Sequence, residues 1–527
     1  MASIRQPVVS VNLIPELSTV SLGQRRGLIV GTVPQDKNGI FGTGTTKFLQ
    51  ESQAVSFESK TKEELAELFG TGRLFHTIQQ AISGGNKAFP FDVLLVKNAE
   101  STDFSTLTFA GAATSKGTLS FSLFDDAQFG VKIDYVAGDT AGQVSTKVYN
   151  ALIGKPNLPF TMALIPAGSV TFTWKDGFNT NSTPMHVKCF DAGLAPTVSH
   201  ETVTQTTQPT VDLFDIVGDQ RYTTVLWPDY YGNSIQNVLI PFLRDRLNVY
   251  NNILDGIGYT SKTSTLAALI SETATYQSEG VVITGHRLID GLFDASIGAA
   301  DTQFPDGMVA FGAFAIDRTA VDGAILADII SGAEGLADYT GGAALASLPY
   351  HNIPINNTTP NNPAWYFSLE EQRTLKENNI STLGANSAGN TNIIGDWVTL
   401  WKTDTAGNPN NVWTPLEHIR TSSIVREYFS SSARTRFGKT RMTNGDMVAG
   451  RSMVNKSLVE VWAQNVFQEL GALALVTAGA LALEQFQKRL SVVLNTRQGE
   501  ILINSEVEIV THVGIINFNL RVTTQYK

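Results

Sequence analysis

Hydrophobic and polar residues alternate near the N-terminus of the chain. Val9, Val11 and Leu13 fall on one side of a predicted strand, with Ser10 and Asn12 on the other. Alternation with a period of two is typical of a half-buried strand. The same alternation recurs near the C-terminus, at Ile516, Phe518, Leu520 and Val522. We therefore predict an N-terminal arm over residues 1–20 and a C-terminal hairpin or arm over residues 499–527.

Uninterrupted hydrophobic runs replace this alternation in the body of the chain, at residues 27–31, 91–96, 223–227 and 281–283. Such runs are typical of strands that are buried on both faces. Helical periodicity lies between them, over residues 61–82, 235–250 and 263–276. Strands that alternate with helices predict a layered, mainly parallel sheet. We assign this α/β core to residues 21–100 and 211–498.

The last third of the core carries signals for helix starts. Ser368 and Glu371 have the spacing of a capping box, and Thr414 precedes a proline that suits a first helical turn. A long helical region is predicted over residues 454–490. It includes the apolar run 471–483, which at thirteen residues is too short to span a bilayer. We interpret that run as a buried core helix.

Short alternating strands distinguish residues 101–210 from the rest of the chain. They are predicted at 119–123, 131–135, 170–174 and 185–189, with one helix whose capping box is Thr140 and Gln143. A Thr/Gln-rich stretch at 201–209 ends the region. The pattern predicts a β-rich domain inserted into the core. The fold class is therefore a multidomain α+β or α/β chain.

Composition narrows the function classes. Charged residues make up 16% of the 527 residues, against about 25% in an average soluble domain. A surface with few charges loses less on desolvation, which favours an assembly subunit. The net charge of −10 argues against nucleic acid as the main partner. The single cysteine, Cys189, excludes an intrachain disulfide, and the N-terminus lacks the apolar stretch of a secretory signal.

Motifs for enzyme chemistry are incomplete. Gly438, Lys439 and Thr440 match the end of a phosphate-binding loop, but Ala433 occupies the position of its first glycine. His186 and Cys189 supply two metal ligands where a zinc site needs three or four. We therefore expect no catalytic, cofactor-binding or metal-binding residues and no cofactor.

The densest group of cationic residues is Arg434, Arg436, Lys439 and Arg441. It is either a solvated helix end or a basic patch that meets an acidic surface of a neighbouring protein.

Several segments, in a fixed order, resemble the contractile tail sheath family of Mu-like phages and tailocins. They are residues 110–120, 131–140, 157–161, 371–373, 379–382, 396–399, 404–413, 424–429, 434–437 and 470–473, followed by the terminal strands. The resemblance covers most of the chain from about residue 100 onward. At the N-terminus the chain departs from the family, because Val8 rather than glycine follows Pro7.

The resemblance implies a structural subunit and no enzyme. Subunits of the family form hexameric rings that stack helically around a tail tube, with the core near the tube and the inserted domain outside. The terminal strands are exchanged between subunits, and contraction drives the tube through a bacterial envelope. The partners implied are further copies, the tail tube protein, and baseplate and terminator proteins, in a virion tail assembled in the host cytoplasm. Neither direct nucleic-acid binding nor membrane insertion is expected. An extracellular β-rich binding module or adhesin is the alternative that the Thr/Asn-rich insertion suggests.

Overall fold

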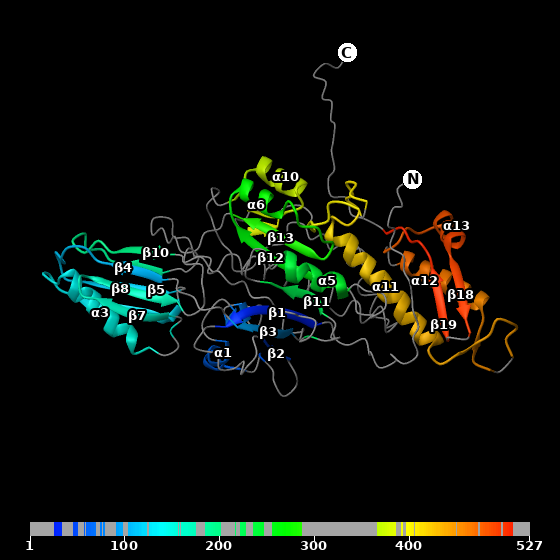
Figure 1. The fold of residues 1–527 in the computed structure, drawn as a ribbon, viewed down its shortest axis with the longest axis horizontal. Coiled ribbons are helices and arrows are strands. Elements are labelled where there is room, and N and C mark those ends of the chain that lie inside the picture. The colour runs from blue at the N-terminus through cyan, green and yellow to red at the C-terminus, as the bar shows by residue number, and fades with distance from the viewer. Residues whose placement is uncertain are drawn as a thin grey trace, which may run out of the picture.

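The computed structural model describes residues 26–33, 46–50, 57, 60–69, 74–75, 77–78, 91–97, 104–123, 126–155, 158, 160–174, 185–201, 217, 222–227, 235–246, 256–286, 366–385, 391–393, 397–404, 406–448, 451–472, 475–496 and 499–509. Figure 1 shows an elongated molecule with a β-rich unit at one end, a large sheet in the middle and a helical region at the other end. No helix among these residues is both long and apolar enough to cross a membrane.

The central sheet has eight strands in the order β15-β14-β13-β12-β11-β1-β3-β2. The six inner strands run parallel, and the two edge strands pair antiparallel. The strands are β1 (Arg26–Val33), β2 (Thr46–Leu49), β3 (Phe91–Lys97), β11 (Tyr222–Leu226), β12 (Ile257–Thr263), β13 (Val281–His286), β14 (Ser381–Ala385) and β15 (Thr391–Ile393). This arrangement confirms the prediction of a mixed α/β fold with a mainly parallel sheet.

Both faces of the central sheet are buried. Along β1, Ile29 belongs to one hydrophobic cluster while Leu28 and Val30 belong to another. Along β13, Val282 and Ile283 divide in the same way. Because successive side chains of a strand point to opposite faces, a strand with two buried faces needs a continuous apolar run.

Short helices accompany the sheet: α1 (Lys62–Phe69), α5 (Ile240–Arg246), α6 (Leu266–Thr273) and α10 (Leu369–Glu377). The capping box of Ser368 and Glu371 forms as predicted. The helix predicted over 235–250 begins as a π-helix, η4 (Ile235–Leu239), and becomes α-helical at Ile240. Pro241 lies inside this continuous helix, next to the point where π-helix changes to α-helix, and it has no N–H group to donate to the preceding turn.

A buried ionic cluster joins three neighbouring parallel strands at their first residues. The fully buried carboxylate of Asp92 on β3 accepts a hydrogen bond from the Arg26 guanidinium on β1 at 2.6 Å. It also accepts one from the Tyr222 hydroxyl on β11 at 2.5 Å. These bonds fix the alignment of β1, β3 and β11 at one end of the sheet. Since β3 precedes the β-rich unit and β11 follows it, the cluster also holds together the two sides of the insertion.

The β-rich unit has its own core between two antiparallel sheets, ordered β10-β4-β8-β7 and β6-β5-β9. Its helix α3 (Ala141–Ile153) contacts β6, β7 and β8 and starts with the predicted capping box of Thr140 and Gln143. The strands are β4 (Phe104–Thr108), β5 (Gly117–Leu123), β6 (Asp126–Tyr135), β7 (Phe160–Ile165), β8 (Ser169–Trp174), β9 (Met185–Lys188) and β10 (Thr197–Glu201). The domain boundaries themselves stay predictions.

Asp191 organises the loops at one end of this unit. Its buried carboxylate accepts hydrogen bonds from the backbone N–H groups of Thr114, Ser115 and Gly193 and from the hydroxyls of Thr114 and Ser115, at 2.8–3.1 Å. Burial alone would raise the pKa of Asp191, but these hydrogen bonds outweigh burial and hold the pKa well below its usual range.

The C-terminal part is built on three helices, α11 (Leu416–Phe437), α12 (Lys456–Ala472) and α13 (Ala480–Arg489). Two short strands, β16 (Arg441–Met442) and β17 (Met453–Val454), pair between α11 and α12. The single helical region expected over 454–490 is interrupted between α12 and α13. Gly479 has a φ of +114°, a backbone conformation that favours glycine, and it immediately precedes α13.

Replacing Asp92 with alanine removes the carboxylate that faces Arg26 and Tyr222. Because breaking a buried ion pair leaves its cationic partner desolvated, we expect the free energy of unfolding to fall by about 3 kcal/mol. Urea denaturation followed by tryptophan fluorescence measures this. The matched control is Asp245→Ala, since the Arg244–Asp245 pair is more than half exposed and we expect it to contribute less than about 1 kcal/mol. Equal losses in the two variants would contradict the structural role of Asp92.

Asp191 should make the β-rich unit sensitive to acid. A carboxyl whose pKa is lower in the folded than in the unfolded state stabilises the fold above the unfolded pKa, and this stability is lost as pH falls through the folded pKa. We expect Asp191→Asn to cost about 3 kcal/mol near neutral pH, because amide hydrogens would face backbone donors. The difference from the wild type should shrink below about pH 4, the ordinary carboxyl pKa. Thermal melts across pH test this, with the exposed Asp134→Asn as control.

Candidate assembly interface

A two-stranded antiparallel sheet lies beside the C-terminal helices. It pairs β18 (Ser491–Asn495) with β19 (Glu500–Asn504). Val492, Ile501 and Ile503 point inward and belong to the same hydrophobic cluster as Phe467 and Phe486 of α12 and α13. An isolated two-stranded hairpin is marginal in water, so contact with these helices stabilises this one.

The opposite face of the β18–β19 sheet includes an exposed apolar side chain. Val493 is 51% exposed, and its cross-strand partner is Leu502. Within the described part of the chain, no third strand pairs with β18 or β19. A sheet edge presents backbone donors and acceptors that another strand can satisfy. This small sheet therefore has the geometry of an acceptor for added strands.

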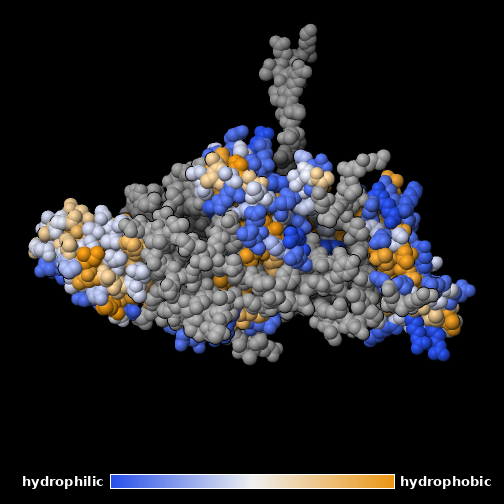
Figure 2. All heavy atoms as spheres, in the orientation of Figure 1, coloured by the Kyte–Doolittle hydropathy of each residue, from blue (hydrophilic) through white to orange (hydrophobic). Residues whose placement is uncertain are grey.

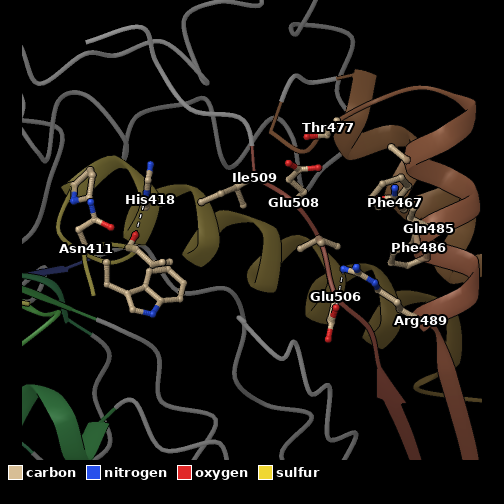
Figure 3. A pocket seen from close by; sticks show the side chains of 15 residues that line it. Asn411, His418, Phe467, Thr477, Gln485, Phe486, Arg489, Glu506, Glu508 and Ile509 are labelled. Carbon is tan, nitrogen blue, oxygen red and sulfur yellow. Dashed lines mark hydrogen bonds and ion pairs between the residues drawn. The ribbon is translucent and has the colours of Figure 1, made fainter. Parts of the chain in front are cut away.

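A cavity of about 640 Å³ lies next to this sheet. Figure 3 shows that its walls come from the start of α11, from α12 and α13, and from the segment after β19. That segment is held by a hydrogen bond from the Thr477 amide to the Glu508 carbonyl at 2.8 Å. An ion pair of 2.7 Å joins Arg489 and Glu506 at its rim. The lining also includes Phe467 and Phe486, whose rings stack at 4.4 Å.

The predicted basic patch lies at the other end of α11. Arg436, Lys439 and Arg441 are exposed, the first near the end of α11 and the last on β16. Arg434 belongs to α11, but its side chain lies outside what the structure describes. The cluster is therefore a solvent-facing group at the junction of α11 and β16.

The residues that resemble a phosphate loop lie at the wrong end of a helix. Lys439 and Thr440 follow the last residue of α11, and the Thr440 amide donates to the Phe437 carbonyl at 3.0 Å. Phosphate is bound by the free N–H groups of a helix N-terminus, whereas this end presents carbonyl groups.

The structure describes only one side chain of the two possible metal ligands. Cys189 is half-buried, with its sulfur 3.9 Å from the Tyr135 hydroxyl, and the side chain of His186 lies outside the described residues. Across the described ranges, no cluster of three or more His, Cys, Asp or Glu residues could hold a metal ion.

All the residues predicted to form the exchanged arms lie outside the described residues. They are Val9, Val11 and Leu13 in the N-terminal arm and Ile516, Phe518, Leu520 and Val522 in the C-terminal arm. Their pairing stays a prediction. Strand β19 lies within the predicted C-terminal arm (499–527), whereas no strand was predicted at β18. The sequence signal for β18 was the pair of adjacent valines, Val492 and Val493, because β-branched residues favour strands.

Several solved structures are similar to this chain. A sheath tail protein of Listeria innocua is 12% identical, with a TM-score of 0.41 over 94% of each chain. A sheath tail protein of Desulfitobacterium hafniense is 11% identical, with a TM-score of 0.41 over 93% of this chain and 96% of that one. The contracted helical sheath of the anti-feeding prophage is 11% identical, with a TM-score of 0.42 over 100% of this chain and 98% of that one.

Searches against protein-family models and against curated proteins found no match to this chain. The similarity to sheath tail proteins is one of overall structure at low sequence identity.

Proposed function

We propose that this chain is the structural subunit of a contractile tail sheath and works through contacts with copies of itself. The observation that carries the proposal is the two-stranded sheet of β18 and β19, which is anchored on one face and has no third strand among the described residues. Segments with strand periodicity lie at both ends of the same chain. The ordered motifs that resemble the sheath family support the same function.

In this proposal, the N-terminal arm at residues 1–20 and the part of the C-terminal arm (499–527) that follows β19 add strands to the β18–β19 sheets of neighbouring copies. Each added backbone hydrogen bond contributes about 1 kcal/mol net, so an arm of several residues gives a stable link. The open edge fixes the direction of the added strand, and the alternation of apolar side chains fixes its register. Residues 21–100 and 211–498 form the core of the subunit, and residues 101–210 form the inserted outer domain.

Hexameric rings stacked around a tail tube are the assembly that the proposal implies. Contraction is then a rearrangement of rigid subunits between two packings while the arms stay paired and act as hinges. If the extended packing is kinetically trapped, its release needs no nucleotide. The core would face the tube, and the partners at the two ends of the sheath would be baseplate and terminator proteins in a virion tail.

The arms are tested by single substitutions that all add the same charge. Two place it on the apolar side of a predicted strand, and two place it on the polar side. Val11→Asp and Phe518→Asp place a carboxylate on the apolar side of each predicted strand. Ser10→Asp and Asn519→Asp place the same charge on the polar side. We expect the first pair to abolish assembly and the second pair to preserve it, as seen by sedimentation and negative-stain electron microscopy.

Deletion of residues 1–16 or 515–527 should likewise yield folded monomers, with circular dichroism as the folding control. Tubes formed by either truncated chain would contradict the proposal.

The basic patch is tested by reversing one exposed charge. We expect Lys439→Glu to leave self-assembly of the chain intact but to weaken assembly on tail tube protein, because the patch is proposed to face an acidic surface. The difference should narrow as salt rises from low to physiological strength, since exposed charges are screened. Lys132→Glu, at an exposed lysine on β6 of the β-rich unit, serves as the control. Equal effects of both variants would show that net charge matters and the patch does not.

A further inference from the structure

The two sheets of the β-rich unit present different outer surfaces. On the β6-β5-β9 sheet, the exposed side chains include Lys132, Asp134 and Lys188. On the β10-β4-β8-β7 sheet, the outward side chains that the structure describes carry no charge. Most are Thr or Ser, in rows that cross β10, β4 and β8. This surface, called the hydroxyl face, consists of Thr106, Thr108, Ser169, Thr171, Thr197 and Ser199.

The second surface is a group of loops at the end of the unit away from the core. The chain enters the unit at Phe104 and leaves it at Glu201, and these two residues are paired across β4 and β10. The opposite ends of those strands therefore point away from the connections to the central sheet. The loops there, residues 109–116, 136–140, 166–168 and 189–196, are called the distal tip.

Apolar side chains project from the distal tip and from the strand end beside it. Phe190 is 91% exposed, Val136 is 52% exposed and Ile165, the last residue of β7, is 44% exposed. Figure 2 shows mainly pale and orange atoms over this unit, in contrast to the deep blue areas at the opposite end of the molecule. Burial of the Phe190 ring in a contact would remove its apolar surface from water, which is favourable.

The polar groups of the distal tip are satisfied within the loops. The Ala110 amide donates to the Leu194 carbonyl at 3.0 Å, and the Ala113 amide donates to the Asp139 carbonyl at 2.8 Å. The Asp191 carboxylate accepts the bonds described above. Burying such a surface leaves few polar groups without a hydrogen-bond partner, so the free-energy penalty for removing them from water is small.

The backbone of the tip is also held in one conformation. Gly111 has a φ of +76°, and a β-carbon at this position would lie 2.4 Å from the Gly193 carbonyl oxygen. Such close packing pre-organises the loops, which lowers the entropic cost of docking.

The charge of the unit favours another copy of this chain as the partner. Residues 104–201 contain six lysines, six aspartates and one glutamate and no arginine, so their formal charge is −1, whereas the whole chain carries −10. Most of the net charge that makes copies repel each other therefore lies elsewhere. Two copies that meet at this unit face less net repulsion than copies that meet through the rest of the surface.

We propose that the distal tip of one copy docks on the hydroxyl face of a second copy. The tip lies at the end of the unit and the face lies on its side, so the two do not meet within one chain. A contact between different surfaces repeats from copy to copy and builds rings or helices. The proposal extends the proposed function, on which it rests, by adding a contact between outer domains to the links made by the arms.

The experiment compares two matched pairs of full-length variants. Phe190→Ser removes the projecting ring of the tip, and Leu369→Ser is its control, since Leu369 on α10 is 84% exposed. Thr171→Lys puts a charge on the hydroxyl face, and Thr118→Lys puts the same charge on the opposite, already charged sheet. Thermal melting establishes that each variant folds, and sedimentation gives the critical concentration for polymer formation.

We expect Phe190→Ser and Thr171→Lys each to raise the critical concentration about tenfold, as for a contact residue of moderate importance. The controls should leave it unchanged. The critical concentration of the double variant should be no higher than that of the single variant with the larger effect, because both changes remove the same contact.

Wild-type critical concentrations in both test variants would overturn this inference and leave the proposed sheath function intact. An effect of Phe190→Ser without one of Thr171→Lys would also overturn it, because the tip would then bind a different surface. If the wild type forms small oligomers that respond to both variants but never tubes, the sheath function fails and the contact stands. A wild-type chain that stays monomeric would overturn both.

Discussion

Backbone hydrogen bonding at the edges of sheets is the constraint on which the organisation of this protein depends. The large sheet ends in β2 and β15, which are short and antiparallel to their neighbours, and short edge strands discourage further pairing. The β18–β19 sheet has only two strands in the described part of the chain, so both are edge strands. The large sheet therefore discourages additional strands, and the small sheet is the one that we propose accepts them.

A subunit that is linked to its neighbours through sheet edges also has to be rigid. If arms link neighbouring copies, force applied to an arm has to move the whole subunit and not deform it. The buried contacts of Asp92 with Arg26 and Tyr222 join three strands across the insertion point. Between the last helices, the Tyr428 hydroxyl donates to Glu469 at 2.7 Å, and the Trp462 indole donates to Ser432 at 3.1 Å. These bonds between α11 and α12 support the base of the small sheet.

Features set by residues close together in the sequence could be predicted. Features set by packing against residues far away in the sequence could not. The capping boxes at Thr140 and Ser368 formed as predicted because each involves residues three positions apart. Strand β12 was missed because Gly258, Thr260 and Lys262 interrupt its apolar pattern. Gly258 is required there by packing, since a β-carbon would lie 2.9 Å from Leu243. The pairing of the arms depends on other copies of the chain, so the fold of one copy does not contain it.

The distribution of charge extends this reasoning from one subunit to an array. A polymer of subunits that each carry −10 is opposed by repulsion, which contacts between copies have to overcome. In the proposed assembly, strand addition by the arms supplies backbone hydrogen bonds that do not depend on charge. The outer unit, with a formal charge of only −1 over residues 104–201, adds contacts where repulsion is weakest. A subunit whose contacts are divided in this way can keep its arms paired while its outer contacts break and form again, which is what a change between two packings requires.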